Sequence, residues 1–267
     1  MSVIEMSHRS AEYEAIHYDT IERLRRLYAV PEDFDILLLQ GGATLLFAMI
    51  PMNLAPAGAE GGARPVGHVL SGSWGKKAFG DAAKVSAAYP AWTEEGPAFT
   101  RMPSPADVTV QDGTAYLHVT SNETIEGTRM PGFDGFDVPL VADMSSDYLT
   151  RPIDWSRFDM VYGGAQKNLG PAGLGVAFVR SELARTSPDN LPSYLRLDSH
   201  AKADSLFNTP PVFSVWATGK MLAWMEANGG VPAMEKRAAE RSGMVYDTID
   251  GSNGFYRNPV EPAYRSH

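Results

Sequence analysis

The chain has 267 residues, of which 44% are hydrophobic and 21% are charged, a balance that is typical of a folded globular protein and argues against disorder. Its net charge of -9 disfavours nucleic acid and anionic membranes as partners, because no excess of basic residues exists to neutralise phosphates. The sequence has no cysteine, which excludes disulfides, thiolate metal sites and a cysteine nucleophile, and we expect no metal site.

The length suits one large α/β domain, or a large domain with a smaller one. The first residues carry charges too early for the apolar core of a signal peptide. No apolar run approaches the roughly 18 residues of a membrane span. We therefore expect a soluble, cytoplasmic protein.

Apolar periodicity predicts helices and strands in alternation along the chain. A helix is predicted over residues 10–28, ended by Pro31, and a strand follows over 34–39. Further strands are predicted over residues 66–70, 115–120, 138–143, 159–162 and 175–179, and further helices over 74–89, 212–228 and 232–247. Because some of these strands are continuous apolar runs, we expect a mainly parallel sheet covered by helices on both faces, in a doubly wound α/β domain.

A lysine and an aspartate stand at the ends of two predicted buried strands. Asp143 ends one strand, and Lys167 comes shortly after the next. A charged side chain in such a place costs desolvation energy unless a partner uses it. Pyridoxal 5'-phosphate chemistry requires this pair, because the lysine amine forms a Schiff base and the aspartate keeps the pyridine nitrogen protonated. The sequence therefore predicts pyridoxal phosphate as cofactor and Lys167 and Asp143 as catalytic residues.

Small and polar residues follow three earlier strands as well. The run Gly41-Gly-Ala-Thr44 opens a predicted helix, where free N–H groups can bind an anion, or where the glycines only make a tight turn. Trp74 could stack on a flat cofactor or only pack, and Thr124 could bond to a ring oxygen or only shape a turn. Their recurrence at successive strand ends, where open α/β sheets bind ligands, favours the ligand-binding interpretation.

In this order, these runs resemble the phosphoserine aminotransferase family, a class V group of fold-type I pyridoxal phosphate enzymes. The most specific runs are Gly-Ala-Gln-Lys-Asn at 164–168 and Asn-Thr-Pro-Pro at 208–211. The other matching runs lie at 6–10, 40–43, 71–74, 76–78, 120–125, 142–146, 151–154, 170–173 and 254–256. Together they span nearly the whole chain.

The resemblance implies a role for each matching residue. At the cofactor ring, Lys167 carries the Schiff base and Asp143 contacts the pyridine nitrogen, while Trp74 stacks and Thr124 bonds to the ring hydroxyl. The cofactor phosphate is expected to contact Ala43, Thr44, Gln166, Asn208 and Thr209. The first two act through backbone amides, and the last two reach across the interface of a homodimer.

The implied reaction is transamination of 3-phosphohydroxypyruvate by L-glutamate, giving O-phospho-L-serine and 2-oxoglutarate in serine biosynthesis. Arg9, helped by His8, is expected to bind an anionic group of the substrate. The resemblance further implies a large cofactor-binding domain over residues 1–231 and the start of a small C-terminal domain over 232–267. The family's extreme N-terminus and the end of its small domain, which contributes a His and an Arg to substrate binding, are expected to be missing.

Three alternatives stay open at this point. One is a truncated relative that binds the cofactor and dimerises but transaminates weakly or not at all. Another is a different class V activity, such as an alanine–glyoxylate aminotransferase, which the runs at 166–168 and 208–211 disfavour. The last is a non-enzymatic α/β scaffold, which would have to place ligand-suited residues at several strand ends by chance.

Overall fold

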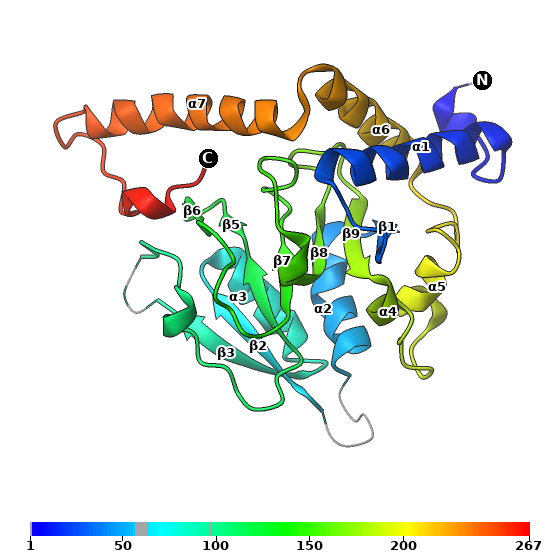
Figure 1. The fold of residues 1–267 in the computed structure, drawn as a ribbon, viewed down its shortest axis with the longest axis horizontal. Coiled ribbons are helices and arrows are strands. Elements are labelled where there is room, and N and C mark those ends of the chain that lie inside the picture. Colours follow the sequence, from blue (N-terminus) through cyan, green and yellow to red (C-terminus); the bar gives the residue numbers. More distant parts are fainter. Residues whose placement is uncertain (1, 57–62, 95, 97) are drawn as a thin grey trace.

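The computed structural model describes residues 2–56, 63–94, 96 and 98–267, and its centre is a seven-stranded sheet in the order β1-β9-β8-β7-β4-β2-β3 (Figure 1). The strands are β1 (Phe34–Gln40), β2 (Pro65–Leu70), β3 (Ala87–Thr93), β4 (Tyr116–Thr120), β7 (Leu140–Asp143), β8 (Phe158–Gly164) and β9 (Leu174–Arg180). Neighbours from β3 to β8 pair in parallel, and β9 is antiparallel to both β8 and β1. The predicted mainly parallel sheet is confirmed.

Helices cover both faces of this sheet (Figure 1). The α-helices are α1 (Ala11–Tyr28), α2 (Gly42–Leu54), α3 (Ser73–Ala82), α4 (Ser181–Ala184), α5 (Leu197–Ala201), α6 (Val212–Ala227) and α7 (Gly230–Asp250). Short 3₁₀ helices occur at Val3–Glu5, Pro105–Asp107, Trp155–Arg157, Ser193–Leu195 and Pro262–Tyr264. A two-stranded hairpin pairs β5 (Asn122–Glu123) with β6 (Thr128–Arg129) beside the main sheet.

Strand β1 shows why the sheet needs cover on both sides. Successive side chains of a strand point to opposite faces. Ile36 and Leu38 pack in the apolar cluster that includes residues of α1 and α6. Leu37 and Leu39 pack in the cluster that includes residues of α2 and α3. A continuous apolar run therefore becomes one strand between two cores, as the sequence predicted.

The predicted helix over 74–89 is wrong in its second half. Helix α3 ends at Ala82, and residues from Ala87 form β3. Among the described strands, β3 lies at the edge of the sheet and is paired with β2 alone, and an edge strand tolerates a proline such as Pro90. Its alanine-rich sequence lacks the apolar alternation that identifies strands.

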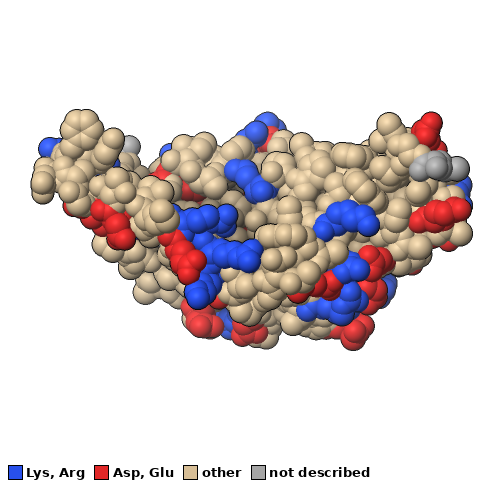
Figure 2. Space-filling model, turned by 90° about the horizontal axis from the view of Figure 1, so that it is seen from above, with Lys and Arg blue, Asp and Glu red and all other residues tan. Residues whose placement is uncertain are grey.

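Helix α7 extends away from the body of the molecule (Figure 1). Val231 is its one residue that is buried in the structure as described. Figure 2 looks onto the side that carries α1, α6 and α7, and there small groups of positive and negative side chains are interspersed in a surface that mostly carries neither. Among the residues that the structure describes, no helix is long and apolar enough to cross a membrane.

Candidate active site

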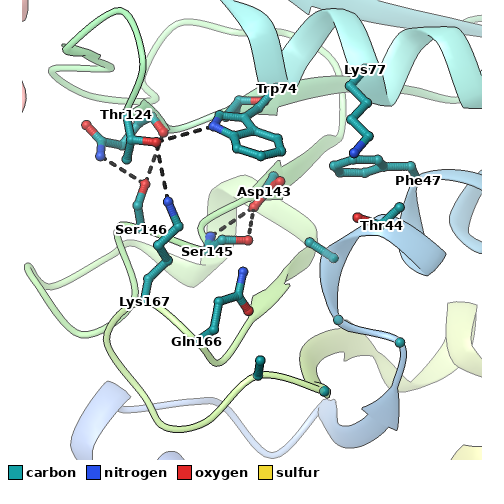
Figure 3. A pocket seen from close by; sticks show the side chains of 17 residues that line it. Thr44, Phe47, Trp74, Lys77, Thr124, Asp143, Ser145, Ser146, Gln166 and Lys167 are labelled. Carbon is teal, nitrogen blue, oxygen red and sulfur yellow. Dashed lines mark hydrogen bonds between the residues drawn. The ribbon is translucent and has the colours of Figure 1, made fainter.

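The carboxyl ends of the parallel strands meet at one edge of the sheet. Thr120 at the end of β4 is paired with Asp143 at the end of β7. Strand β1 runs in the direction of β8, because each is antiparallel to β9, so the start of α2 lies at the same edge. A cavity of about 440 Å³ opens there (Figure 3). Its walls are formed by residues 41–44, Phe47, Trp74, Lys77, Thr120, Asn122, Thr124, Asp143, Ser145, Ser146, Gln166, Lys167, Ala172 and Gly173.

Lys167, Trp74 and Thr124 converge in one wall of this cavity (Figure 3). The Thr124 hydroxyl accepts hydrogen bonds from the indole Nε1 of Trp74 at 3.2 Å and from Nζ of Lys167 at 3.4 Å. The lysine Nζ lies 5.8 Å from the centre of the indole ring. Three residues from three separate strand ends therefore form one connected group with a primary amine facing the cavity.

Asp143 is held in the cavity wall by the turn that follows it. Its Oδ1 accepts hydrogen bonds from the backbone N–H of Ser145 at 2.9 Å and from its hydroxyl at 2.6 Å. The residue is only 5% exposed, and burial raises the pKa of its carboxyl, opposed by these bonds and by the charge of Lys167. Within the described part of the chain, Oδ2 has no hydrogen-bond donor, so a cationic group in the cavity would find an acceptor there.

The start of α2 supplies backbone N–H groups to the same cavity. Gly41 and Gly42 have φ angles of 91° and 61°, a left-handed conformation that glycine adopts at little cost. No side chain of the described residues accepts a hydrogen bond from the N–H groups of Gly42, Ala43 or Thr44. A helix N-terminus with unpaired N–H groups binds anions, because its N–H groups and the helix dipole both favour negative charge.

Seven of the predicted site residues line this cavity: Ala43, Thr44, Trp74, Thr124, Asp143, Gln166 and Lys167. The structure does not bring the other four into its walls. His8 and Arg9 precede α1, where Arg9 is exposed. Asn208 and Thr209 lie in the loop before α6, with the Thr209 carbonyl accepting a hydrogen bond from the Gln40 side chain at 2.5 Å. This contact places the loop near the start of α2.

Sequence reasoning missed several residues of the wall. Phe47 and Lys77 lie one turn inside α2 and α3, where helical spacing alone does not distinguish a cavity from solvent. Lys77 adds a second cation to the cavity wall, toward Phe47 and away from Lys167 (Figure 3), and its Nζ is 5.6 Å from the centre of the Trp74 ring. Ser145 follows Asp143 by two residues, and the Asp-x-Ser spacing is a turn signal that could have identified it.

Comparison with known proteins identifies the group to which this arrangement belongs. A family model described as aminotransferase class-V matches residues 2–266. Phosphoserine aminotransferases from Lysinibacillus sphaericus and Geobacillus kaustophilus are 44% and 46% identical to the chain. Each match covers 100% of this chain and 72% of the relative. The chain belongs to the phosphoserine aminotransferase family of class V aminotransferases.

Solved structures agree with this assignment. The phosphoserine aminotransferase from Bacillus circulans subsp. alkalophilus is 43% identical and superposes with a TM-score of 0.94, over 100% of this chain and 73% of that one. The pyridoxal phosphate-bound phosphoserine aminotransferase from Trichomonas vaginalis is 32% identical, with a TM-score of 0.92 and the same coverage of both chains. The expected fold-type I architecture and family are thus confirmed.

Proposed function

We propose that the chain is a pyridoxal phosphate-dependent transaminase that forms O-phospho-L-serine from 3-phosphohydroxypyruvate and L-glutamate. One observation carries this proposal. The Lys167 amine and the Asp143 carboxylate, from different strand ends, line a single cavity whose opposite wall is a helix start with unpaired N–H groups. Relatives that match the whole chain at 44% and 46% identity carry the name of this activity.

The cavity fits the cofactor at each of its reactive groups. The N–H groups of Ala43 and Thr44, with the side chain of Gln166, suit the phosphate. Asp143 offers its unpaired Oδ2 to the ring nitrogen. Trp74 supplies an aromatic face, as a flat ring requires. These groups support a cofactor site that contacts the phosphate, the ring nitrogen and the face of the ring.

When bound, pyridoxal phosphate supplies an electrophilic carbon and a ring that accepts an electron pair from the substrate α-carbon. Lys167 would act as general base and acid, moving a proton between that α-carbon and the aldehyde carbon of the cofactor. Asp143, buried and oriented by Ser145, keeps the ring nitrogen protonated. Thr124 holds the Lys167 amine beside Trp74 before reaction.

The proposed substrates carry two anionic ends each, and we assign one of these anionic groups to Arg9, helped by His8. Nε2 of His8 is buried and finds no hydrogen-bond partner in the described structure, so it has unused capacity for a ligand. We expect Arg9→Ala to raise KM for both substrates at least tenfold with little change in cofactor binding, because guanidinium–carboxylate pairs are strong contacts. Steady-state kinetics would measure this, and an unchanged KM would remove Arg9 from the substrate site.

A homodimer with shared active sites is part of the proposal. The loop that holds Asn208 and Thr209 is flanked by Phe207 and Phe213, which are 41% and 47% exposed. Two exposed aromatic side chains around a polar pair are typical of an interface. Mixing Lys167→Ala with Asn208→Asp subunits tests the sharing, since only hybrid dimers would contain one site with both native residues. Sedimentation analysis would give the oligomeric state.

The domain boundary near residue 231 is also a proposal, supported by the absence of any buried residue in α7 beyond Val231 in the structure as described. Circular dichroism and thermal unfolding of a chain ending at residue 231 would test it. Retention of cooperative unfolding is expected, and its loss would contradict an independent domain over 1–231. The cytoplasmic location stays a prediction from the sequence.

The decisive experiment is a visible absorption spectrum of the purified chain with pyridoxal phosphate, before and after adding glutamate. We expect a cofactor band that requires Lys167 and bleaches with glutamate. Lys167→Ala should lose the band and all turnover, while its cofactor-free form unfolds at the wild-type temperature. Lys236→Ala, in which the replaced side chain is 78% exposed, should match the wild type in spectrum, turnover and stability. Normal turnover by Lys167→Ala would refute the assignment, and a band that glutamate leaves unchanged would favour a cofactor-binding relative without activity.

A further inference from the structure

A buried glutamate that does not line the cavity stands directly behind its aromatic wall. Glu123 is fully buried, at 0% exposure, next to Thr124 in the chain. Its Oε2 accepts a hydrogen bond from the backbone N–H of Trp74 at 3.0 Å, and its Oε1 accepts one from the N–H of Gly75 at 2.8 Å. The Ser71 hydroxyl also donates to Oε1, at 3.4 Å.

These bonds replace a missing helix cap. Helix α3 begins after Gly72, which has no side chain to bind the first N–H groups of the helix. Glu126 accepts from the N–H of Ser73 at 2.9 Å, and Glu123 takes the next two. The glycines make room for this contact, since a Cβ at Gly72 would lie 2.6 Å from the Glu123 carboxyl carbon and one at Gly75 would lie 3.1 Å from its Oε1.

Trp74 is therefore held at both ends by two consecutive residues. Glu123 fixes its backbone, and Thr124 fixes its indole nitrogen. The pair is anchored in turn, because Glu123 is paired with Thr128 in the β5–β6 hairpin and the N–H of Gly127 donates to its carbonyl at 2.8 Å. An indole with a fixed backbone and a fixed edge has little freedom to tilt.

We propose that Glu123 is a positioning residue that sets the orientation of Trp74 in the cofactor cavity without touching cofactor or substrate. The proposal rests on the proposed function only in taking Trp74 as the residue that stacks on pyridoxal phosphate. Two charged groups, Glu126 and Asp143, face Glu123 and disfavour its ionised form, while the two N–H groups favour it. Burial, the largest influence, raises the pKa of Glu123 to about 7.

A double-mutant cycle tests the proposal through cofactor affinity. Glu123→Gln keeps the shape of the side chain but leaves one of the two N–H groups without an acceptor, so we expect pyridoxal phosphate to bind about tenfold more weakly. Trp74→Ala should weaken binding further. If Glu123 acts through the indole, adding Glu123→Gln to Trp74→Ala should change the affinity by less than twofold. Glu126→Gln is the matched control, because it removes a carboxylate charge at the same helix end, keeps the Oε1 that accepts from Ser73, and does not contact Trp74. It should bind the cofactor within twofold of wild type.

Each outcome decides one question. A tenfold loss in both backgrounds would mean that Glu123 acts on the fold and not on Trp74, and wild-type affinity in Glu123→Gln would likewise overturn the role. A wild-type chain that binds no pyridoxal phosphate would overturn the proposed function and the positioning role with it. Cooperative thermal unfolding of each cofactor-free variant would show that it is folded, so that a loss of affinity cannot be due to misfolding.

A measurement on the cofactor-free wild type keeps the proposal testable if Glu123→Gln does not fold. Protonation of Glu123 weakens its bonds to the N–H groups of Trp74 and Gly75, so their amide proton resonances should shift with a midpoint near pH 7. The indole N–H of Trp74 should shift with the same midpoint. Amides that titrate beside a constant indole resonance would limit Glu123 to capping and overturn the positioning role.

Discussion

Helices α2 and α3 begin at the same edge of the sheet, after glycines that cannot cap them, and reach the same cavity with opposite charge arrangements. At α3, the first three N–H groups are taken by the carboxylates of Glu126 and Glu123. At α2, no described side chain accepts from the first three N–H groups. The start of α3 is closed, meaning that side-chain carboxyl groups of the protein accept its N–H groups. The start of α2 is open, meaning that its N–H groups can bind an anionic ligand.

The difference explains how a protein of net charge -9 can bind an anionic cofactor in one orientation. A phosphate would be attracted to either helix start by the same N–H groups and dipole. The carboxyl groups of Glu126 and Glu123 already accept the first N–H groups of α3 and leave none for a phosphate. In the proposed function, the start of α2 is therefore the expected phosphate site and the start of α3 holds Trp74. The orientation of the bound cofactor would therefore depend on the blocked N–H groups of α3 as well as on the free N–H groups of α2.

The largest effect on cofactor affinity is expected when a carboxylate is introduced at the open start of α2. Thr44→Asp places a carboxylate at the start of α2, as the glutamates do at α3, and we expect pyridoxal phosphate to bind about 100-fold more weakly because like charges repel at short range. The cofactor-free variant should be as stable as wild type or more so, since an acidic residue suits a helix start by about 0.3–1 kcal/mol. Equilibrium titration of the visible band measures the affinity, with uncharged Thr44→Asn as control. Equal binding by both variants would place the phosphate elsewhere.

A smaller effect should appear in stability at the closed end. Folding raises the pKa of Glu123 from 4.5 to about 7, mainly by burial, so between these values the folded chain holds a proton that the unfolded chain has released. The stability due to this proton is present below pH 4.5 and is lost as the pH rises through 7. Between pH 5 and 8, the wild type should therefore lose on the order of 2 kcal/mol relative to Glu123→Gln. Urea unfolding at pH 5 and pH 8 measures the free energy of unfolding of both proteins. An equal change with pH in the wild type and in Glu123→Gln would contradict the raised pKa of Glu123.

The smallest effect concerns a cation that stands between the two helices. Lys77 belongs to α3, and Figure 3 shows its amino group turned toward Phe47 and Thr44 of α2. Because it is exposed, Lys77→Met should weaken pyridoxal phosphate binding only about fivefold and should leave unphosphorylated pyridoxal unaffected. Lys76→Met is the matched control, since the Lys76 amine lies over the Phe99 ring, 4.6 Å from its centre. Equal losses with both ligands would show that Lys77 acts on something other than the phosphate.

Much of the open end could be predicted from the sequence. A Gly-Gly pair after an apolar strand indicates both the turn and the free helix start, and the strand-end positions of Asp143 and Lys167 follow from the same periodicity. The closed end could not be predicted in this way. Glu123 and Gly72 are far apart in the sequence, and nothing in a local pattern shows that a turn glutamate will cap a distant helix.

Two strand elements and four site residues could not be placed from the sequence. The strand β3 was missed because an edge strand needs no apolar face of its own, and its alanines favour helix. The hairpin β5–β6 was missed because two residues per strand carry no period. His8, Arg9, Asn208 and Thr209 were assigned roles by resemblance alone, and their places outside the cavity walls leave those roles as predictions.

The antiparallel pairing of β8 with β9 has a consequence for folding. Gly164 is paired with Gly175, so the segment that carries Lys167 is closed at both ends by a contact of short sequence separation, which has a small entropic cost. The other residues around the cavity come from strand ends that meet only when the whole sheet has formed. A ligand bound there would act as a crosslink across the sheet, adding about 2.7 kcal/mol to the free energy of unfolding at 100 times its Kd. The lifetime of this chain in a cell should therefore depend on the cofactor supply even when no substrate is present.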